Sequence, residues 1–120
     1  MIAKPILAFA LALGLTGAAH AEILPLPAQG ESFWGLGTTG MLCYQEPCPW
    51  NGVFPVYRDG TRGRPLSRFD QRQPPPLRAD AAARARIEAA FEKGGCVVAE
   101  GHFEGETLVV RQLLGDCRGL

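Results

Sequence analysis

The sequence has few of the residues on which catalytic sites usually depend. It holds two histidines, and its only serines, Ser32 and Ser67, lie outside the G-x-S-x-G motif of many hydrolase nucleophiles. It has no C-x-x-C redox motif, no glycine-rich phosphate loop and no paired short spacings of cysteine or histidine for a zinc site. We therefore expect a protein that is not an enzyme and uses no metal and no cofactor.

Long apolar runs are also scarce. The apolar stretch at residues 6–15 is about half of the roughly 20 residues that cross a bilayer. It lies between Lys4 and an A-x-A site at residues 19–21, which is the pattern of a secretory signal peptide. An uncleaved membrane anchor is the alternative. We expect a leader at residues 1–21, one small domain at residues 22–120 with no transmembrane segment, and a periplasmic or secreted location.

The formal net charge is zero, but the charges are unevenly distributed. Arginines concentrate in the middle of the chain, and acidic residues flank them on both sides. A basic stretch can attract nucleic acid or an acidic partner, although a charge-balanced loop is the simpler reading. Because an exported protein meets little nucleic acid, we do not expect a nucleic-acid partner.

Four cysteines offer a disulfide framework. In an oxidising compartment, disulfides supplement the modest core of a small domain. Cys43 and Cys48 lie close together around a proline turn, and Cys96 and Cys117 lie near the two ends of an expected hairpin. Three pairings are possible from sequence. We favour Cys43 with Cys48 and Cys96 with Cys117; joining Cys43 to Cys96 or Cys117 would instead link the edges of a sheet.

Turn residues and strand residues alternate in the first half of the domain. Prolines and glycines predict an irregular lead-in over residues 22–37. Strands are expected at residues 38–45 and 53–57, and Pro55 in the second favours an edge strand or a bulge. Residues 46–52 between them predict a rigid turn.

Residues 58–77 form a long segment that is rich in arginine and proline and has no clear period. Segments of this length without regular structure are unusual in a small domain and often carry function. Leu66 and Phe69 predict at most a short third strand.

The last third of the chain has the strongest local patterns. Residues 79–93 are rich in alanine and end at two glycines, which predicts a helix. Two β-rich runs, residues 96–103 and 107–114, surround a glycine-containing turn and predict a hairpin. The apolar stripe of the helix consists of Ala83, Ile87, Ala90 and Phe91.

The region from residue 79 to 115 resembles the last third of an OB-fold. The resemblance rests on a helix followed by a closing hairpin with a rhythm of strand and turn residues. These residues are Ala99, Gly101, Phe103, Leu108 and Val110. It implies an α+β, mainly β protein: a partly closed, OB-like barrel of five strands, with one helix before the C-terminal hairpin and disulfide links. The first half of the domain departs from this pattern, and the resemblance implies no functional residue.

One set of residues could form a binding face, because tryptophan, tyrosine and arginine dominate binding hot spots. Its members are Trp50, Tyr57, Arg58, Arg62, Arg64 and Arg68. Core packing is the alternative role for the aromatic residues.

The polar residues of the hairpin offer weaker candidates. His102 and three glutamates, Glu100, Glu104 and Glu106, lie near its turn. Catalysis by histidine needs a positioned partner, and acidic residues around a hairpin commonly keep a sheet edge soluble. We expect an exposed histidine at a strand end and solvated edge charges.

The sequence as a whole predicts a small exported module that binds a protein or a cell-envelope component. The alternative is an inhibitor of a secreted hydrolase, such as a protease or a lysozyme, that presents the turn at residues 47–50. The identity of the partner and the oligomeric state stay open at this point.

Overall fold

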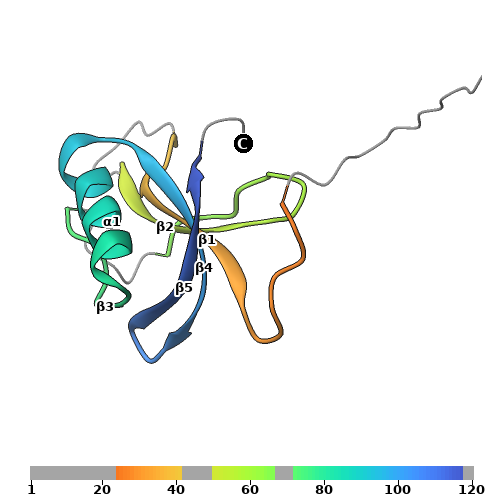
Figure 1. Cartoon of the computed structure of the whole chain (residues 1–120). Coiled ribbons are helices and arrows are strands. Elements are labelled where there is room, and N and C mark those ends of the chain that lie inside the picture. The colour runs from red at the N-terminus through yellow and green to blue at the C-terminus, as the bar shows by residue number, and fades with distance from the viewer. Residues whose placement is uncertain (1–23, 42–49, 67–71, 118–120) are drawn as a thin grey trace, which may run out of the picture.

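The computed structural model describes residues 24–41, 50–66 and 72–117. The predicted leader, the predicted bridge between Cys43 and Cys48, and Arg68 lie outside these residues. The elements in chain order are β1 (Ser32–Thr38), β2 (Asn51–Val56), β3 (Leu77–Arg78), α1 (Ala81–Lys93), β4 (Cys96–Glu104) and β5 (Thr107–Asp116). The strands form one sheet in the order β2-β1-β4-β5-β3, which is not closed into a barrel (Figure 1). The protein is therefore α+β and mainly β, as the sequence predicts.

Strand β1 corrects the prediction for the first third of the domain. The expected irregular lead-in contains a strand in the interior of the sheet, which pairs antiparallel with β2 on one side and with β4 on the other. Two glycines of this segment, Gly35 and Gly37, lie in the strand and leave room for close neighbours. A Cβ atom on Gly35 would collide with the ring of Phe54, which lies across this position from β2. The strand thus ends at Thr38, where we expected one to begin.

Strand β2 lies at an edge of the sheet, as Pro55 suggests. On the open edge of β2, the segment at residues 61–66 makes three backbone hydrogen bonds to β2 and to Tyr57, which follows it. Tyr57 N donates to Thr61 O at 2.9 Å, Gly63 N to Pro55 O at 2.8 Å, and Leu66 N to Val53 O at 2.8 Å. Part of the predicted long loop is therefore ordered against the sheet.

The third strand is not at the position that the sequence suggested. Leu66 makes one backbone hydrogen bond to β2 but lies in no strand, and Phe69 is outside the described residues. Strand β3 is instead the pair Leu77–Arg78 after the proline run, and it pairs parallel with β5. Such a short strand is defined by its distant partner, so local composition does not reveal it.

The predictions for the helix and the hairpin are confirmed. Asp80 precedes α1 as its N-cap and accepts a hydrogen bond from Ala83 N at 2.7 Å. The four residues of the predicted apolar stripe are the buried residues of α1. Strands β4 and β5 pair antiparallel, and Cys96 is joined to Cys117 with their Cα atoms 5.3 Å apart. No helix in the described residues has the length and apolar character of a membrane span.

Each face of the sheet carries a hydrophobic cluster. A single strand contributes to both clusters, because successive strand residues point to opposite sides of the sheet. Helix α1 covers one face of the sheet (Figure 1). One hydrophobic cluster lies beneath the helix, and the other lies on the opposite face. The helix-side cluster contains Leu36, Val53, Ile87, Phe91, Val97, Ala99 and Leu108. The outer cluster contains Phe33, Phe54, Val56, Val98 and Cys117, with Leu24, Cys96 and Leu114 packed against it.

Candidate binding site at the N-terminal strap

Residues 24–31, which we call the strap, lie along the outer side of the sheet (Figure 1, orange). At its beginning, Leu24 packs on the outer cluster and its backbone N donates to Arg58 O at 3.0 Å. Arg58 Nε donates in turn to Pro25 O at 3.3 Å. Backbone and side chain of Arg58 thus hold the first two residues of the strap.

Glu100 of β4 holds the middle of the strap. Its side chain is almost fully buried, and Oε2 accepts a hydrogen bond from Ala28 N at 2.7 Å. Oε1 accepts from Arg111 at 2.9 Å and from Gln112 at 2.7 Å. The hydrogen bond from Ala28 N is the main cause that lowers the pKa of Glu100, with help from Gln112 and Arg111 and against the opposing effect of burial. The expectation of a solvated edge charge is therefore wrong for Glu100, because this carboxylate joins three segments.

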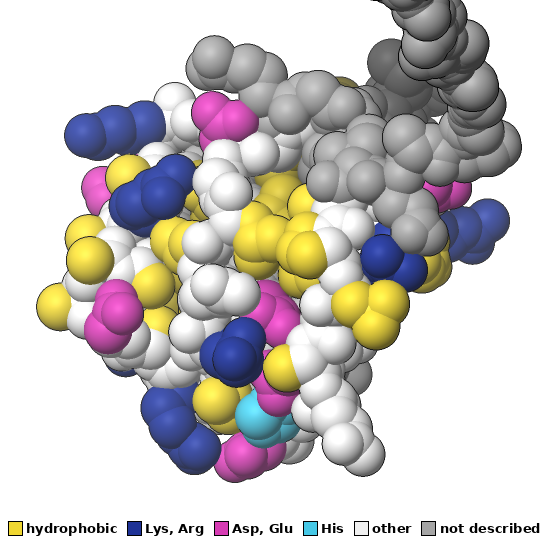
Figure 2. Space-filling view, turned by 45° about the vertical axis from the view of Figure 1, so that its right-hand side comes forward, with side chains coloured by type: hydrophobic (Ala, Val, Ile, Leu, Met, Phe, Trp, Pro, Cys, Tyr) yellow, Lys and Arg dark blue, Asp and Glu magenta, His cyan; other side chains and the backbone are white. Residues whose placement is uncertain are grey.

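His102 holds the end of the strap. Its Nδ1 lies 2.8 Å from Glu31 Oε2, and its Nε2 lies 3.0 Å from Glu104 Oε2. Hydrogen bonds to Glu104 and then to Glu31 raise the pKa of His102, and its bond to Glu104 lowers the pKa of that carboxyl. Arg78 Nη1 donates to Glu104 at 3.1 Å. Figure 2 shows the histidine (cyan) with acidic side chains (magenta) next to it.

This arrangement also corrects the expectation of an exposed, solvated histidine. His102 is only partly exposed and is bonded to carboxylates through both ring nitrogens. Both ring nitrogens thus contact carboxylates of this chain, one in the strap and one on β4. The geometry assigns this histidine a role in holding the strap.

A pocket of about 240 Å³ lies where the strap crosses the ends of β1 and β2. We call it the strap pocket. Its lining residues are Pro27 of the strap, Ser32, Phe33 and Trp34 of β1, Pro55 and Val56 of β2, and Tyr57 and Arg58 of the turn that follows. Flat aromatic and prolyl rings make up most of this lining, which suits an apolar ring of a ligand.

The aromatic walls of the strap pocket are held in place. Trp34 Nε1 donates to Gly101 O at 3.1 Å, and its ring meets that of Phe103 edge to face at 5.0 Å. Tyr57 begins a turn that is closed by the hydrogen bond from Gly60 N to Tyr57 O at 2.8 Å. Its hydroxyl reaches Gly63, where a Cβ atom would lie 3.0 Å from it. The ring of Trp34, which is held by two contacts, loses little entropy when a ligand binds.

The structure brings together only part of the predicted binding face. Tyr57 and Arg58 line the strap pocket. Trp50 precedes β2 while Tyr57 follows it, so the two half-exposed rings are separated by the strand, which is roughly 20 Å long at about 3.3 Å per residue. Arg64 is exposed, and Arg68 is outside the described residues.

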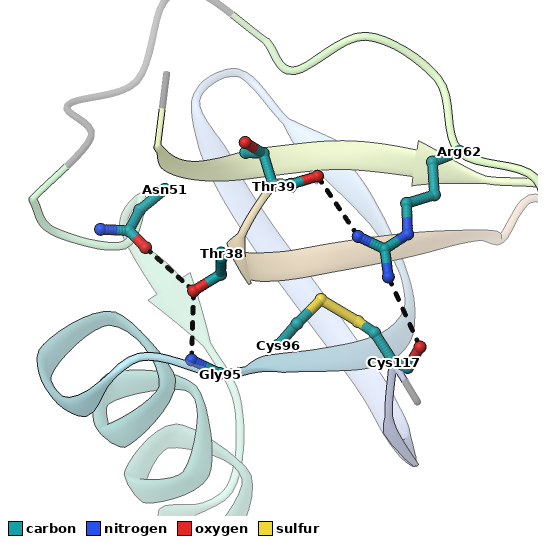
Figure 3. The surroundings of a disulfide bond; sticks show 7 residues. All are labelled: Thr38, Thr39, Asn51, Arg62, Gly95, Cys96 and Cys117. Atoms are coloured by element: carbon teal, nitrogen blue, oxygen red, sulfur yellow. Dashed lines mark hydrogen bonds between the residues drawn. A yellow bond between two sulfur atoms is a disulfide. The ribbon is translucent and has the colours of Figure 1, made fainter. Parts of the chain in front are cut away.

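Arg62 lies near the disulfide rather than in the strap pocket (Figure 3). Its guanidinium donates to Thr39 O at 3.3 Å and to Cys117 O at 3.5 Å, and it lies 5.2 Å from the centre of the Phe54 ring. It borders a cavity of about 380 Å³ next to Cys96–Cys117. These contacts cover the outer cluster and give Arg62 a structural role.

The sequence pointed to two residues of the strap pocket and missed Trp34, Pro27 and Ser32. These come from the segment that we expected to be irregular, although the adjacent aromatic residues Phe33 and Trp34 favour a strand. In the part of the chain that the structure describes, no group of three or more histidine, cysteine, aspartate or glutamate side chains is placed to hold a metal ion. Comparisons with models of protein families, with curated proteins and with solved structures found no match for this chain.

Proposed function

We propose that this protein is a small exported binding module that takes an extended segment of a partner protein in the strap pocket. The observation that carries the proposal is the aromatic lining formed by Trp34 and Tyr57 beside the prolyl rings of Pro27 and Pro55, with the Trp34 ring held by its hydrogen bond to Gly101 O. Tyr57 is 53% exposed although it is held in a tight turn. Exposed rings that are held rigidly are typical of binding surfaces.

The surroundings of the pocket support a polypeptide as the ligand. Arg58 already binds an extended stretch of main chain here, namely Leu24 and Pro25 of the strap. Leu26, next to the pocket wall, is 69% exposed, which adds apolar area beside the opening. Grooves lined by aromatic rings recognise proline-containing segments in other proteins. We therefore expect a prolyl or aromatic side chain of the partner to enter the pocket.

The Cys96–Cys117 bridge fits an oxidising compartment, and with the sequence of residues 1–21 it supports export to the periplasm or the outside. The order of β3, α1 and the β4–β5 hairpin supports an OB-like arrangement. The alternative partner is a component of the cell envelope. Of the turn at residues 47–50 that the inhibitor hypothesis needs, the structure describes only Trp50.

The proposal can be tested with an array of short peptides that contain proline or aromatic residues, followed by titration of the strongest binder. Tyr57→Ala should weaken binding about tenfold or more, because an aromatic hot spot commonly contributes about 2 kcal/mol. Trp50→Ala is the matched control. This ring is 50% exposed but lies at the other end of β2, so its loss should leave the affinity unchanged.

Two results would count against the proposal. In one, no peptide of the array binds to the wild-type protein. In the other, the loss of Trp50 weakens binding as much as the loss of Tyr57, which would place the binding face elsewhere.

A further inference from the structure

The contact between His102 and two carboxylates requires a particular protonation state. Each ring nitrogen lies within hydrogen-bond distance of a glutamate oxygen, at 2.8 Å for Glu31 and 3.0 Å for Glu104. A carboxylate can only accept, so both nitrogens must carry a proton. Neutral imidazole has one N–H and would turn a lone pair towards one of the two glutamates.

Glu31 depends strongly on this histidine. Its side chain is only 13% exposed, and its Oε1 is buried without a hydrogen-bond partner among the described residues. A buried carboxylate that loses its cationic partner pays a desolvation cost. Glu104 is in a different position, because it is half exposed and also bonded to Arg78.

The other charged groups near His102 are two arginines and the carboxylates to which they are bonded. Arg78 of β3 is bonded to Glu104, and Arg111 of β5 is bonded to Glu100. The pKa of Glu100 and that of Glu104 are both lowered, so these carboxylates stay ionised wherever histidine titrates. His102 is therefore the group whose charge changes near neutral pH.

The strap turn, residues 28–31, connects this cluster to the strap pocket. It is closed by the hydrogen bond from Glu31 N to Ala28 O at 2.9 Å. Pro27 precedes the turn and Ser32 follows it, and both line the pocket. Any movement of Glu31 away from β4 therefore shifts one wall of the pocket relative to the other.

We infer that His102 is a pH-dependent latch: its protonated ring holds the strap turn against β4, and its neutral ring lets the turn detach and reshapes the strap pocket. The latch stands on the contacts above, whereas its effect on binding rests on the function proposed for the pocket. The folded-state pKa of His102 is raised above the usual 6.5. The contribution of the latch is thus complete below about pH 6.5 and is lost as the pH rises through the higher folded-state pKa.

Hydrogen exchange of the Ala28 and Glu31 amides tests the latch directly, because both donate hydrogen bonds in the docked turn. Rates are measured on the purified protein without ligand and are corrected for the intrinsic effect of pH. The opening equilibrium of the turn should increase from pH 5.5 to pH 8.5, because the contacts that need the protonated ring are lost as the pH rises through the raised pKa of His102. Amides of α1 should show no such change and report on the integrity of the fold.

Three substitutions separate the parts of the latch. His102→Gln and Glu31→Gln should each remove the pH response, because one lacks the titrating ring and the other lacks its buried partner. Glu104→Gln should keep the response but move its midpoint to lower pH, since the bond to Glu104 is the main cause that raises the pKa of His102. Glu92→Gln, an exposed change on α1, is the control and should behave as the wild type.

The inference is overturned if the corrected exchange of the strap turn is constant with pH, or if the response persists in His102→Gln. Its consequence for the pocket is read from Trp34, which becomes the single tryptophan of the chain in Trp50→Phe. Quenching of the Trp34 fluorescence by a small neutral solute should increase over the same pH range, because the detached strap turn leaves the pocket more open. Because neither measurement uses a peptide, a failure of the peptide titrations would leave the latch standing, and a failure of the latch would leave the pocket standing.

Discussion

Gly35 and Phe54 determine how the outer face of the sheet is filled. Phe54 is almost fully buried, and its ring occupies the space that a side chain on Gly35 would need. From the sequence alone, Gly35 contributes to the prediction of an irregular segment, although it lies between the apolar residues Trp34 and Leu36. Composition alone cannot distinguish a glycine that bends the chain from one that leaves room for a neighbouring ring, because the ring comes from another strand.

Gly35→Ala should therefore lower the free energy of unfolding by about 1–3 kcal/mol, as expected for an overpacked core. Gly52→Ala is a matched control in the adjacent strand, where a Cβ atom would make ordinary contacts at 3.7 Å with Pro65 and Thr39. Its effect should stay within about 0.5 kcal/mol. Denaturant unfolding of both variants measures the difference, and equal losses would contradict the packing described here.

At the scale of elements, β4 contacts both the helix-side cluster and the strap. Val97 and Ala99 face the helix-side cluster, while Glu100 and His102 hold the strap. The helix and the hairpin could be predicted because their signals are local: an apolar stripe, a glycine stop and a turn. Strand β1 and the burial of Glu100 could not, because both depend on partners far away in the sequence, such as Ala28 at a separation of 72 positions.

Glu100→Gln tests the central anchor of the strap. The lowered pKa of Glu100 means that its carboxylate contributes stability above pH 4.5, and that this contribution is lost as the pH falls through the lower folded-state value. The variant should lose about 1–3 kcal/mol at neutral pH, because Gln has one acceptor oxygen where the carboxylate has two, and these accept from three donors. It should also lose less stability than the wild type on acidification.

Chemical unfolding at neutral pH and at pH 3 to 4 measures both effects. Glu106→Gln, an exposed change at the turn of the same hairpin, serves as the control. An acid response of Glu100→Gln equal to that of the wild type would show that another group carries the acid sensitivity.

For the whole molecule, each face of the sheet has its own cover. Helix α1 covers one face, and the strap, Arg62 and the disulfide cover the other. The strap pocket lies at the border of this outer cover, where a segment from the beginning of the domain meets the turn after β2. Tyr57 and Arg58 could be proposed from sequence because they are neighbours, but Pro27 and Trp34 join them only through the tertiary fold.

The Cys96–Cys117 bridge closes the open ends of β4 and β5 across a separation of 21 positions. Replacement of both residues by serine should cost about 3 kcal/mol, from the loop entropy that the bridge removes in the unfolded chain. A Cys43→Ser/Cys48→Ser variant should lose less, because the expected bridge there would close a much shorter loop. Denaturation midpoints of the two variants give the comparison. A first variant as stable as the wild type would argue that this bridge adds nothing to the fold.

The interior position of β1 has a consequence for how the protein folds. Local pairing with β2 can form early, but Trp34 reaches its acceptor Gly101 only across 67 positions. Proteins dominated by such remote contacts fold slowly, because a long loop must close before the contacts form. The sheet therefore cannot acquire its native strand order until β5, the last strand in the sequence, has been synthesised. Until then, β1 lacks a paired β4–β5 hairpin on one of its sides.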